Sequence, residues 1–130
     1  MTVPAIDGER QRRDSLGRRA EAKSLWFLRL RGYRLLARRV RTPRGEIDLV
    51  VRRGGTVAFV EVKARRSLAA AAEAITPRQR RRIARAAEAF LAGRPDLSGL
   101  DVRLDAMFVV PGRLPVHLRD AWQTESEDGQ

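Results

Sequence analysis

Two apolar segments separated by a pair of glycines constrain the fold of this chain more than any other feature of its sequence. The first segment, residues 46–53, reads EIDLVVRR, and the second, residues 56–64, reads TVAFVEVKA. Gly54-Gly55 between them is typical of a two-residue hairpin turn, because glycine adopts positive φ without steric cost. The sequence therefore predicts an antiparallel β-hairpin whose two strands have a defined register.

This register brings charged side chains together. Asp48 falls opposite Glu61, and Glu46 falls opposite Lys63. Because side chains alternate between the two faces of a strand, all four are expected on one face. Two facing carboxylates repel each other, and a divalent cation such as Mg²⁺ or Mn²⁺, which prefers carboxylate oxygens, would offset that repulsion. The alternative is that both acids pair with arginines on a solvated face.

The lysine in the second strand is an unusual choice for this chain. Two of its 27 basic residues are lysines, Lys23 and Lys63. Lysine is a compact charge whose pKa shifts readily, whereas guanidinium stays protonated. Lys63 can therefore hold a water nucleophile or neutralise charge on a phosphate. Together with Asp48 and Glu61 it suggests metal-assisted hydrolysis of a phosphodiester.

Charge and composition narrow the class of partner. The 27 basic and 16 acidic residues give a net charge of +11, which favours a polyanion such as nucleic acid over other partners. A solvated basic surface is the alternative. Cysteine is absent, which excludes disulfides and thiolate metal sites. No apolar run approaches the roughly 18 residues of a membrane span, so the expected location is the cytoplasm, with no membrane partner.

The rest of the chain reads as alternating helices and strands. Asp14 or Ser15 can cap a helix that runs to about residue 31. Thr76, Pro77 and Gln79 form a T-x-x-Q capping box at the start of a second helix that ends at Gly93. Strands are expected at 33–41, at 101–110 and at about 116–122. The order indicates an α/β domain with a mixed sheet, covering 14–122, with flexible tails at 1–13 and 123–130.

Two groups of arginines are candidates for contacting nucleic-acid phosphates. The first follows the lysine strand, and the second lies at the start of the second helix, where free backbone N–H groups also attract phosphate. A solvated helix face explains the second group equally well. The candidates are Arg65, Arg66, Arg78, Arg81 and Arg82.

Several motifs together resemble the YraN family of restriction-endonuclease-like proteins. They are GEIDL at 45–49, FVEVKAR at 59–65, GRRAEA at 17–22, RGYRLL at 31–36 and RLD at 103–105. This family belongs to the group with a PD-(D/E)xK nuclease core, which includes archaeal Holliday-junction resolvases. Ile47 and Leu104 depart from the pattern, since the wider group has proline at the first position and the family often has phenylalanine at the second.

The resemblance implies a three-layer αβα core. It also implies that Asp48 and Glu61 hold one Mg²⁺ or Mn²⁺, that Lys63 is the catalytic lysine, and that Glu21 is an auxiliary acid. Without the resemblance, Glu21 is either functional or paired with Arg18, and Glu46 either positions Lys63 or simply starts its strand.

Other residues receive simpler interpretations. Gln79 is explained by its capping box rather than by a contact with phosphate. His117, the single histidine, is interpreted as a surface residue. Trp26 is expected in the core together with the phenylalanines at 27, 90 and 108.

The sequence therefore predicts a metal-dependent endonuclease. DNA is favoured over RNA as the substrate, although the sequence does not decide between them, and branched or damaged DNA are the candidate forms. A homodimer would suit junction cutting, because such a junction can be cut symmetrically. The alternatives are a catalytically silent nucleic-acid-binding module with the same fold, and a protein-interaction domain whose charge is incidental.

Overall fold

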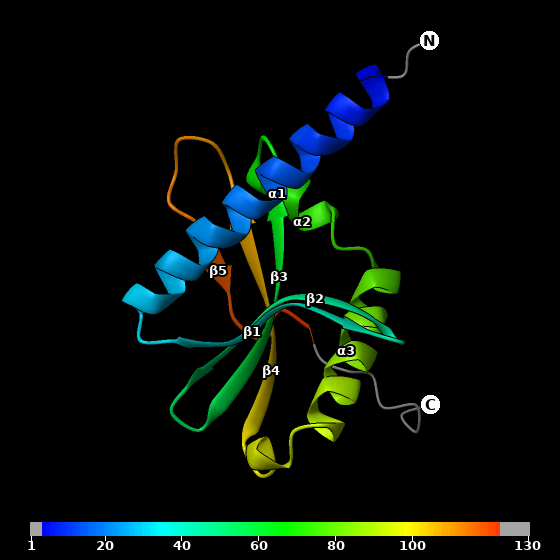
Figure 1. Cartoon of the computed structure of the whole chain (residues 1–130). Helices are drawn as coiled ribbons and strands as arrows, with labels where there is room; N and C mark the ends of the chain where they lie inside the picture. The colour runs from blue at the N-terminus through cyan, green and yellow to red at the C-terminus, as the bar shows by residue number, and fades with distance from the viewer. Residues whose placement is uncertain (1–3, 123–130) are drawn as a thin grey trace.

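The computed structural model describes residues 4–122 (Figure 1). Its helices and strands alternate along the chain much as the sequence predicts. In order they are α1 (Pro4–Leu30), β1 (Arg34–Thr42), β2 (Gly45–Arg53), β3 (Thr56–Ala64), α2 (Leu68–Glu73), α3 (Pro77–Ala92), a 3₁₀ turn η1 (Pro95–Leu97), β4 (Asp101–Val109) and β5 (Val116–Leu118).

The five strands form one mixed sheet in the order β1-β2-β3-β4-β5. Strands β3 and β4 are parallel, and the other neighbours are antiparallel. A parallel pair needs a crossover connection, and α2 with α3 supplies it between β3 and β4. The predicted mixed sheet is confirmed.

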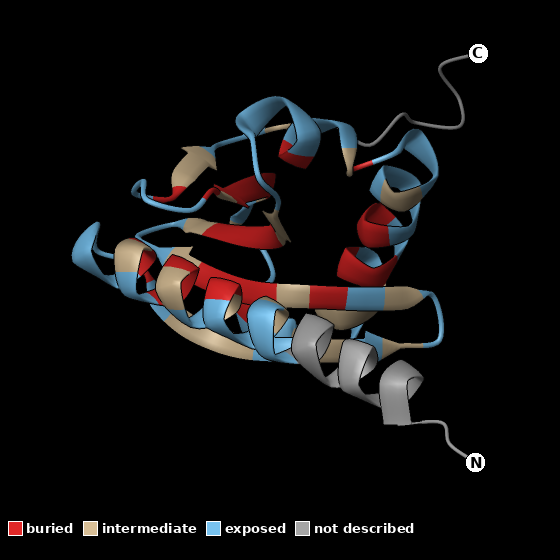
Figure 2. Cartoon of the chain, turned by 90° about the horizontal axis from the view of Figure 1, so that it is seen from above, coloured by how far each residue is buried: buried red, intermediate tan, exposed pale blue. Residues whose placement is uncertain are grey.

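Helices cover both faces of the sheet, as Figures 1 and 2 show. On one face, Leu25 and Leu28 of α1 pack on Leu49 and Val60. On the other face, Ile83 and its neighbours in α3 pack on the opposite sides of the same strands, and α2 covers the area near β4. The buried colouring in Figure 2 follows the central strands between these layers. This is the expected three-layer αβα arrangement.

The β2–β3 hairpin has the predicted register over its first half. Arg53 pairs with Thr56, and the ladder continues to Leu49 opposite Val60. It ends there, because β2 turns away and continues its pairing with β1 on its other side. The β1–β2 turn then approaches α3 closely. Gly45 has φ +154, and a Cβ placed on it would lie 3.3 Å from the Arg82 carbonyl oxygen.

Some element boundaries differ from the expectation. Helix α1 begins at Pro4, ten residues before the predicted cap, so residues 4–13 belong to a helix rather than to a tail. The short helix α2 and the turn η1 carry no predicted counterpart, because six and three residues are too few for a periodic signal. Strand β5 is three residues long. The predicted tail segments 1–3 and 123–130 lie outside the described residues.

Two predictions about burial are wrong. Trp26 is 52% exposed, on the side of α1 that faces away from the sheet. The His117 side chain is 6% exposed, because it hydrogen-bonds to a buried aspartate on β4. None of the helices in the described part of the chain is both long and apolar enough to cross a membrane.

Candidate active site

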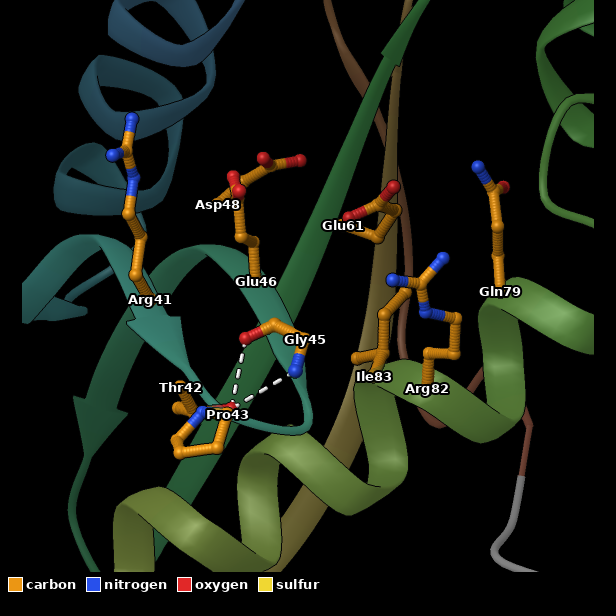
Figure 3. A pocket seen from close by; sticks show the side chains of 10 residues that line it. All are labelled: Arg41, Thr42, Pro43, Gly45, Glu46, Asp48, Glu61, Gln79, Arg82 and Ile83. Carbon is orange, nitrogen blue, oxygen red and sulfur yellow. Dashed lines mark hydrogen bonds between the residues drawn. The ribbon is translucent and has the colours of Figure 1, made fainter.

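A pocket of about 520 Å³ lies between the diverging end of the β2–β3 hairpin and the first turns of α3. Figure 3 shows its walls: β1 and β2 on one side, β3 at the back and α3 on the other side. Acidic side chains come from the strands, while basic and amide side chains come from the strand end and the helix. The lining residues are Arg41, Thr42, Pro43, Gly45, Glu46, Asp48, Glu61, Gln79, Arg82 and Ile83.

The divergence of the two strands creates the acidic centre of this pocket. Where the backbone ladder ends, the side chain of Asp48 takes its place: Oδ2 accepts a hydrogen bond of 2.8 Å from the Val62 backbone N–H. Glu61 is 9% exposed and faces Asp48 across the pocket (Figure 3). The sequence prediction that these two carboxylates meet is confirmed, although they meet beyond the ladder rather than as a ladder pair.

The environment of Asp48 disfavours its charged form. Burial, and then repulsion from the Glu61 carboxylate, raise the pKa of Asp48 from 3.8 to about 7, although the Val62 N–H acts in the opposite sense. Both causes are expected when two acids share a site that is poor in water. A half-buried acid with a raised pKa in a pocket is typical of functional sites.

Lys63 neutralises part of this acidic pair. Its Nζ lies 3.1 Å from Glu61 Oε2, and its side chain is 15% exposed. Both residues lie on one face of β3, two positions apart, as the sequence predicts. Glu46 lines the pocket and is exposed. In the β1–β2 ladder its backbone lies opposite that of Arg41. The ion-pair partner of Lys63 is therefore Glu61, and not Glu46 as the hairpin register suggested.

Helix α3 supplies a residue that sequence reasoning assigned to a different role. The Thr76 hydroxyl caps the helix by accepting from the Gln79 N–H at 3.2 Å, which confirms half of the capping box. The side chain of Gln79 does not complete the box. Its Oε1 is buried and has no hydrogen-bond partner among the described residues, and the side chain lines the pocket opposite the strands (Figure 3). The sequence could not show that the Gln79 side chain leaves the Thr76 backbone N–H and faces the pocket instead.

The arginines fall into two groups in space. Arg82 lines the pocket from α3, and Arg41 lines it from the end of β1. The sequence analysis missed Arg41, because nothing in the 34–42 segment distinguishes it from the other exposed arginines there. The remaining candidates, Arg65, Arg66, Arg78 and Arg81, are exposed and lie outside the pocket lining.

Glu21, the expected auxiliary acid, is not part of the pocket lining. Its carboxylate accepts from Arg39 Nε at 2.8 Å, and its side chain is 13% exposed. The basic partner of Glu21 is thus Arg39 on β1, and not Arg18 on its own helix.

Asp48 and Glu61 form the acidic pair that could hold a cation. Among the described residues, no three side chains of His, Cys, Asp or Glu converge in a way that could hold a metal ion. Two carboxylates nevertheless fit Mg²⁺, which commonly binds one or two protein carboxylates together with water and substrate phosphate. The raised pKa of Asp48 fits as well, since a cation between the acids would relieve the repulsion that raises it.

A second buried polar cluster lies on the α1 face of the sheet. Asp105 has no exposed surface and accepts hydrogen bonds from Arg103, His117 and the Asp120 backbone N–H. Arg103 also donates to the Tyr33 hydroxyl at 2.6 Å. Burial acts most strongly on the pKa of Asp105 and would raise it, but these donors hold the pKa below its ordinary value. The RLD motif at 103–105 was noted in the sequence, but its role in a buried hydrogen-bond network was not predicted.

Fold and pocket define a class of three-layer αβα domains that carry an acidic pair and a lysine on a central hairpin. Within that class, the chain belongs to the family described as "Uncharacterised protein family UPF0102", whose model matches residues 20–109. This is the YraN family that the motifs indicated, and the resemblance is confirmed.

Individual relatives match most of the chain. A UPF0102 protein of Parvibaculum lavamentivorans is 56% identical over 108 residues, which cover 83% of this chain and 81% of the relative. A UPF0102 protein of Methylorubrum extorquens is 52% identical over 126 residues, which cover 96% of this chain and 98% of the relative. A third, from Bradyrhizobium, is 55% identical over 106 residues, covering 82% and 75%.

Proposed function

We propose that this protein is a metal-dependent endonuclease that hydrolyses phosphodiester bonds in DNA. The observation that carries the proposal is the acidic pair itself: Asp48 and Glu61 share one pocket, largely removed from water, with Lys63 ion-paired to Glu61. Such an arrangement costs stability in the absence of a cation, so a purely structural role does not explain it.

The residues divide the work between them. Asp48 and Glu61 would hold Mg²⁺ or Mn²⁺, which when bound would supply Lewis acidity toward a phosphoryl oxygen. Lys63 places its positive charge beside the pair, where negative charge develops on a phosphate during hydrolysis. Arg41 and Arg82 stand on opposite walls of the pocket, and their guanidinium groups suit the flanking phosphates.

The overall charge supports nucleic acid as the substrate class. A net charge of +11 favours long anionic polymers. DNA, including branched or damaged DNA, is the substrate we propose. A preference for four-way junctions would be accompanied by a two-fold dimer, because a closed symmetric assembly presents two identical sites.

A catalytically silent nucleic-acid-binding module is the second candidate. It is favoured by the finding that the described residues contain no cluster of three metal-ligating side chains. In such a module the basic surface would bind DNA, and the two carboxylates would share one proton instead of a cation. The two candidates differ in turnover, and not in binding.

Cleavage of labelled duplex, single-stranded and four-way-junction DNA in Mg²⁺, in Mn²⁺ and in EDTA tests the proposal. Wild type is compared with Asp48→Asn and Lys63→Ala. Lys23→Ala is the matched control, because it removes the other lysine and the same charge at a site that contacts the Arg113 carbonyl. We expect metal-dependent cutting that falls at least about 100-fold in the two site variants and is retained in the control.

Two results would contradict the proposal. Cutting that persists in EDTA, or that survives Asp48→Asn and Lys63→Ala, would place the activity elsewhere. DNA binding without cutting in either metal would favour the silent module.

A further inference from the structure

Arg39 has a backbone conformation that arginine rarely adopts. It lies within β1, yet its φ is +52°, and the one other non-glycine residue with positive φ in the described range is Asp120. The left-handed region is strained for a residue with a long side chain, and such residues occur preferentially at functional sites. The conformation therefore needs an explanation beyond strand pairing.

The strained residue lies across the ladder from the acidic pair. The β1–β2 register pairs Arg38 with Leu49 and Val40 with Ile47. Arg39 lies between these pairs and so stands opposite Asp48. The left-handed conformation interrupts the regular alternation of side chains at Arg39, opposite the proposed metal ligand, and is separate from the register shift between Leu35 and Ala37.

The guanidinium of Arg39 is held from one edge. Its Nε donates to Glu21 Oε1 at 2.8 Å, and it makes no further hydrogen bond to the described residues. Glu21 is 13% exposed, whereas Arg39 is 41% exposed. The acid thus holds the Nε of a planar group whose side chain is 41% exposed, while Nη1 and Nη2 donate no hydrogen bond to the described residues.

We propose that Arg39 binds a backbone phosphate of the nucleic acid, and that Glu21 is the positioning residue that orients it. A guanidinium binds phosphate through two parallel N–H groups. Holding its other edge in advance lowers the conformational entropy lost on binding. The assignment rests on the proposed function, since it takes nucleic acid as the ligand, and it explains why Glu21 lies outside the pocket.

Binding measurements in EDTA test this assignment without turnover. Fluorescence anisotropy of labelled duplex and four-way-junction DNA is followed at several salt concentrations. The variant is Arg39→Asn, because asparagine tolerates the left-handed conformation and the backbone can therefore stay in place. Arg38→Asn is the matched control: it removes the same charge from the neighbouring, exposed position of β1, for which no positive φ is observed.

For Arg39→Asn we expect an affinity loss of about 5- to 10-fold and a log–log salt slope smaller by about one. Its melting temperature should be unchanged or higher. Arg38→Asn should lose less than about 2-fold, as expected for a change in general charge. Equal losses in the two variants would overturn the assignment of Arg39.

Glu21 provides a test in which simple electrostatics predicts the opposite result. Glu21→Ala adds one positive charge, which by itself should tighten DNA binding. If Glu21 orients Arg39, the variant binds DNA about 2- to 5-fold more weakly, and Glu21→Ala combined with Arg39→Asn is no weaker than Arg39→Asn alone. Glu88→Ala, at an exposed position of α3, is the control and should bind as tightly as wild type or more tightly.

The proposed function and the roles of Arg39 and Glu21 can be contradicted separately. If wild type shows no salt-dependent DNA binding, both the proposed function and the role of Arg39 are wrong. If wild type binds DNA and cuts it in metal, but Glu21→Ala tightens binding as Glu88→Ala does, the positioning role alone is wrong.

Discussion

Two aspartates, one on each face of the sheet, have opposite surroundings: Asp105 is fully buried and Asp48 is half-buried. Asp105 lies on the α1 face beside Val60. Asp48 lies on the α3 face, in the pocket with Glu61. The first receives hydrogen bonds from two cationic or ionisable side chains and one backbone N–H, whereas the second receives one from the Val62 backbone and faces another acid. Their pKa values are accordingly shifted in opposite directions.

The difference separates a structural carboxylate from a candidate catalytic one. A buried charge that is fully hydrogen-bonded ties together the elements that bond to it, here β4, β5 and the turn after β5. Tyr33 in the α1–β1 turn is joined to this cluster through Arg103. A buried charge that lacks donors is stable with a proton or a cation, and it persists because the surrounding fold holds it there. The number of donors around each acid, and not burial alone, identifies the candidate site.

The largest effect is expected at the structural acid. Asp105→Asn removes the charge that satisfies Arg103 and His117, whose side chains are 19% and 6% exposed. Leaving Arg103 without its counter-charge, and His117 beside a weaker acceptor, should lower the free energy of unfolding by about 3–5 kcal/mol. Urea unfolding measures this loss. Asp101→Asn, at an exposed position of the same strand, is the control and should change the free energy of unfolding by less than about 0.5 kcal/mol. Equal effects in the two variants would show that Asp105 has no special structural role.

The proposed metal ligand Asp48 should respond in the opposite direction. Asp48→Asn keeps an oxygen for the Val62 N–H and removes a charge that is buried beside Glu61. In metal-free protein at pH 8 we expect the free energy of unfolding to rise by about 2 kcal/mol. In Mg²⁺ or Mn²⁺ the same variant should no longer cut DNA. Glu46→Gln, at an exposed position in the same pocket, is the control. A loss of stability in Asp48→Asn would show that this carboxylate is structural.

The stability gained by Asp48→Asn should depend on pH. Between about pH 4 and 7 native Asp48 holds a proton that the unfolded chain has released, because its pKa is raised from 3.8 to about 7. The native state binds more protons, so the stability of wild type falls with rising pH across this window. The difference between variant and wild type should therefore be small near pH 4, grow to about pH 7 and then stay constant. A constant difference across this range would contradict the assigned shift.

Saturating Mg²⁺ provides the matching experiment at pH 8. It should raise the melting temperature of wild type, because the ion binds the native state, and have little effect on Asp48→Asn. Equal shifts in both proteins would argue against a cation at this acidic pair.

The smallest effect is expected at the edge of the structural cluster. Tyr33→Phe removes the hydroxyl that accepts from Arg103 at 2.6 Å and leaves the bond between Arg103 and Asp105. The free energy of unfolding should fall by about 1 kcal/mol, with DNA binding and cleavage unchanged. A substantial loss of cleavage would show that the two faces of the sheet are coupled.

Much of the fold could be predicted from local chemistry. The glycine pair set the hairpin register from Arg53 and Thr56 to Leu49 and Val60, and Thr76 marked the start of α3. These predictions succeeded because turn geometry and helix capping involve residues that are close in the sequence. The resemblance added the three-layer arrangement and the roles expected of Asp48, Glu61 and Lys63, and the family is confirmed.

Side-chain partners were harder to predict, because they come from distant segments. Glu21 on α1 is paired with Arg39 on β1. His117 is buried against Asp105, twelve residues away. In each case the choice among many arginines and few acids depends on how the layers pack, and no spacing rule reports it.

The sequence by itself determined the α/β class, the hairpin and the face on which Glu61 and Lys63 lie, because alternation along a strand is a local property. The tertiary structure alone decided where the β2–β3 ladder ends. That divergence opens the pocket, and it places Asp48 beside Glu61 with few donors. Only the packed structure decided, too, that Arg39 adopts a left-handed conformation and pairs with Glu21. Burial and charge at each acid are sums over neighbours from several elements, and those neighbours meet only when the chain has folded.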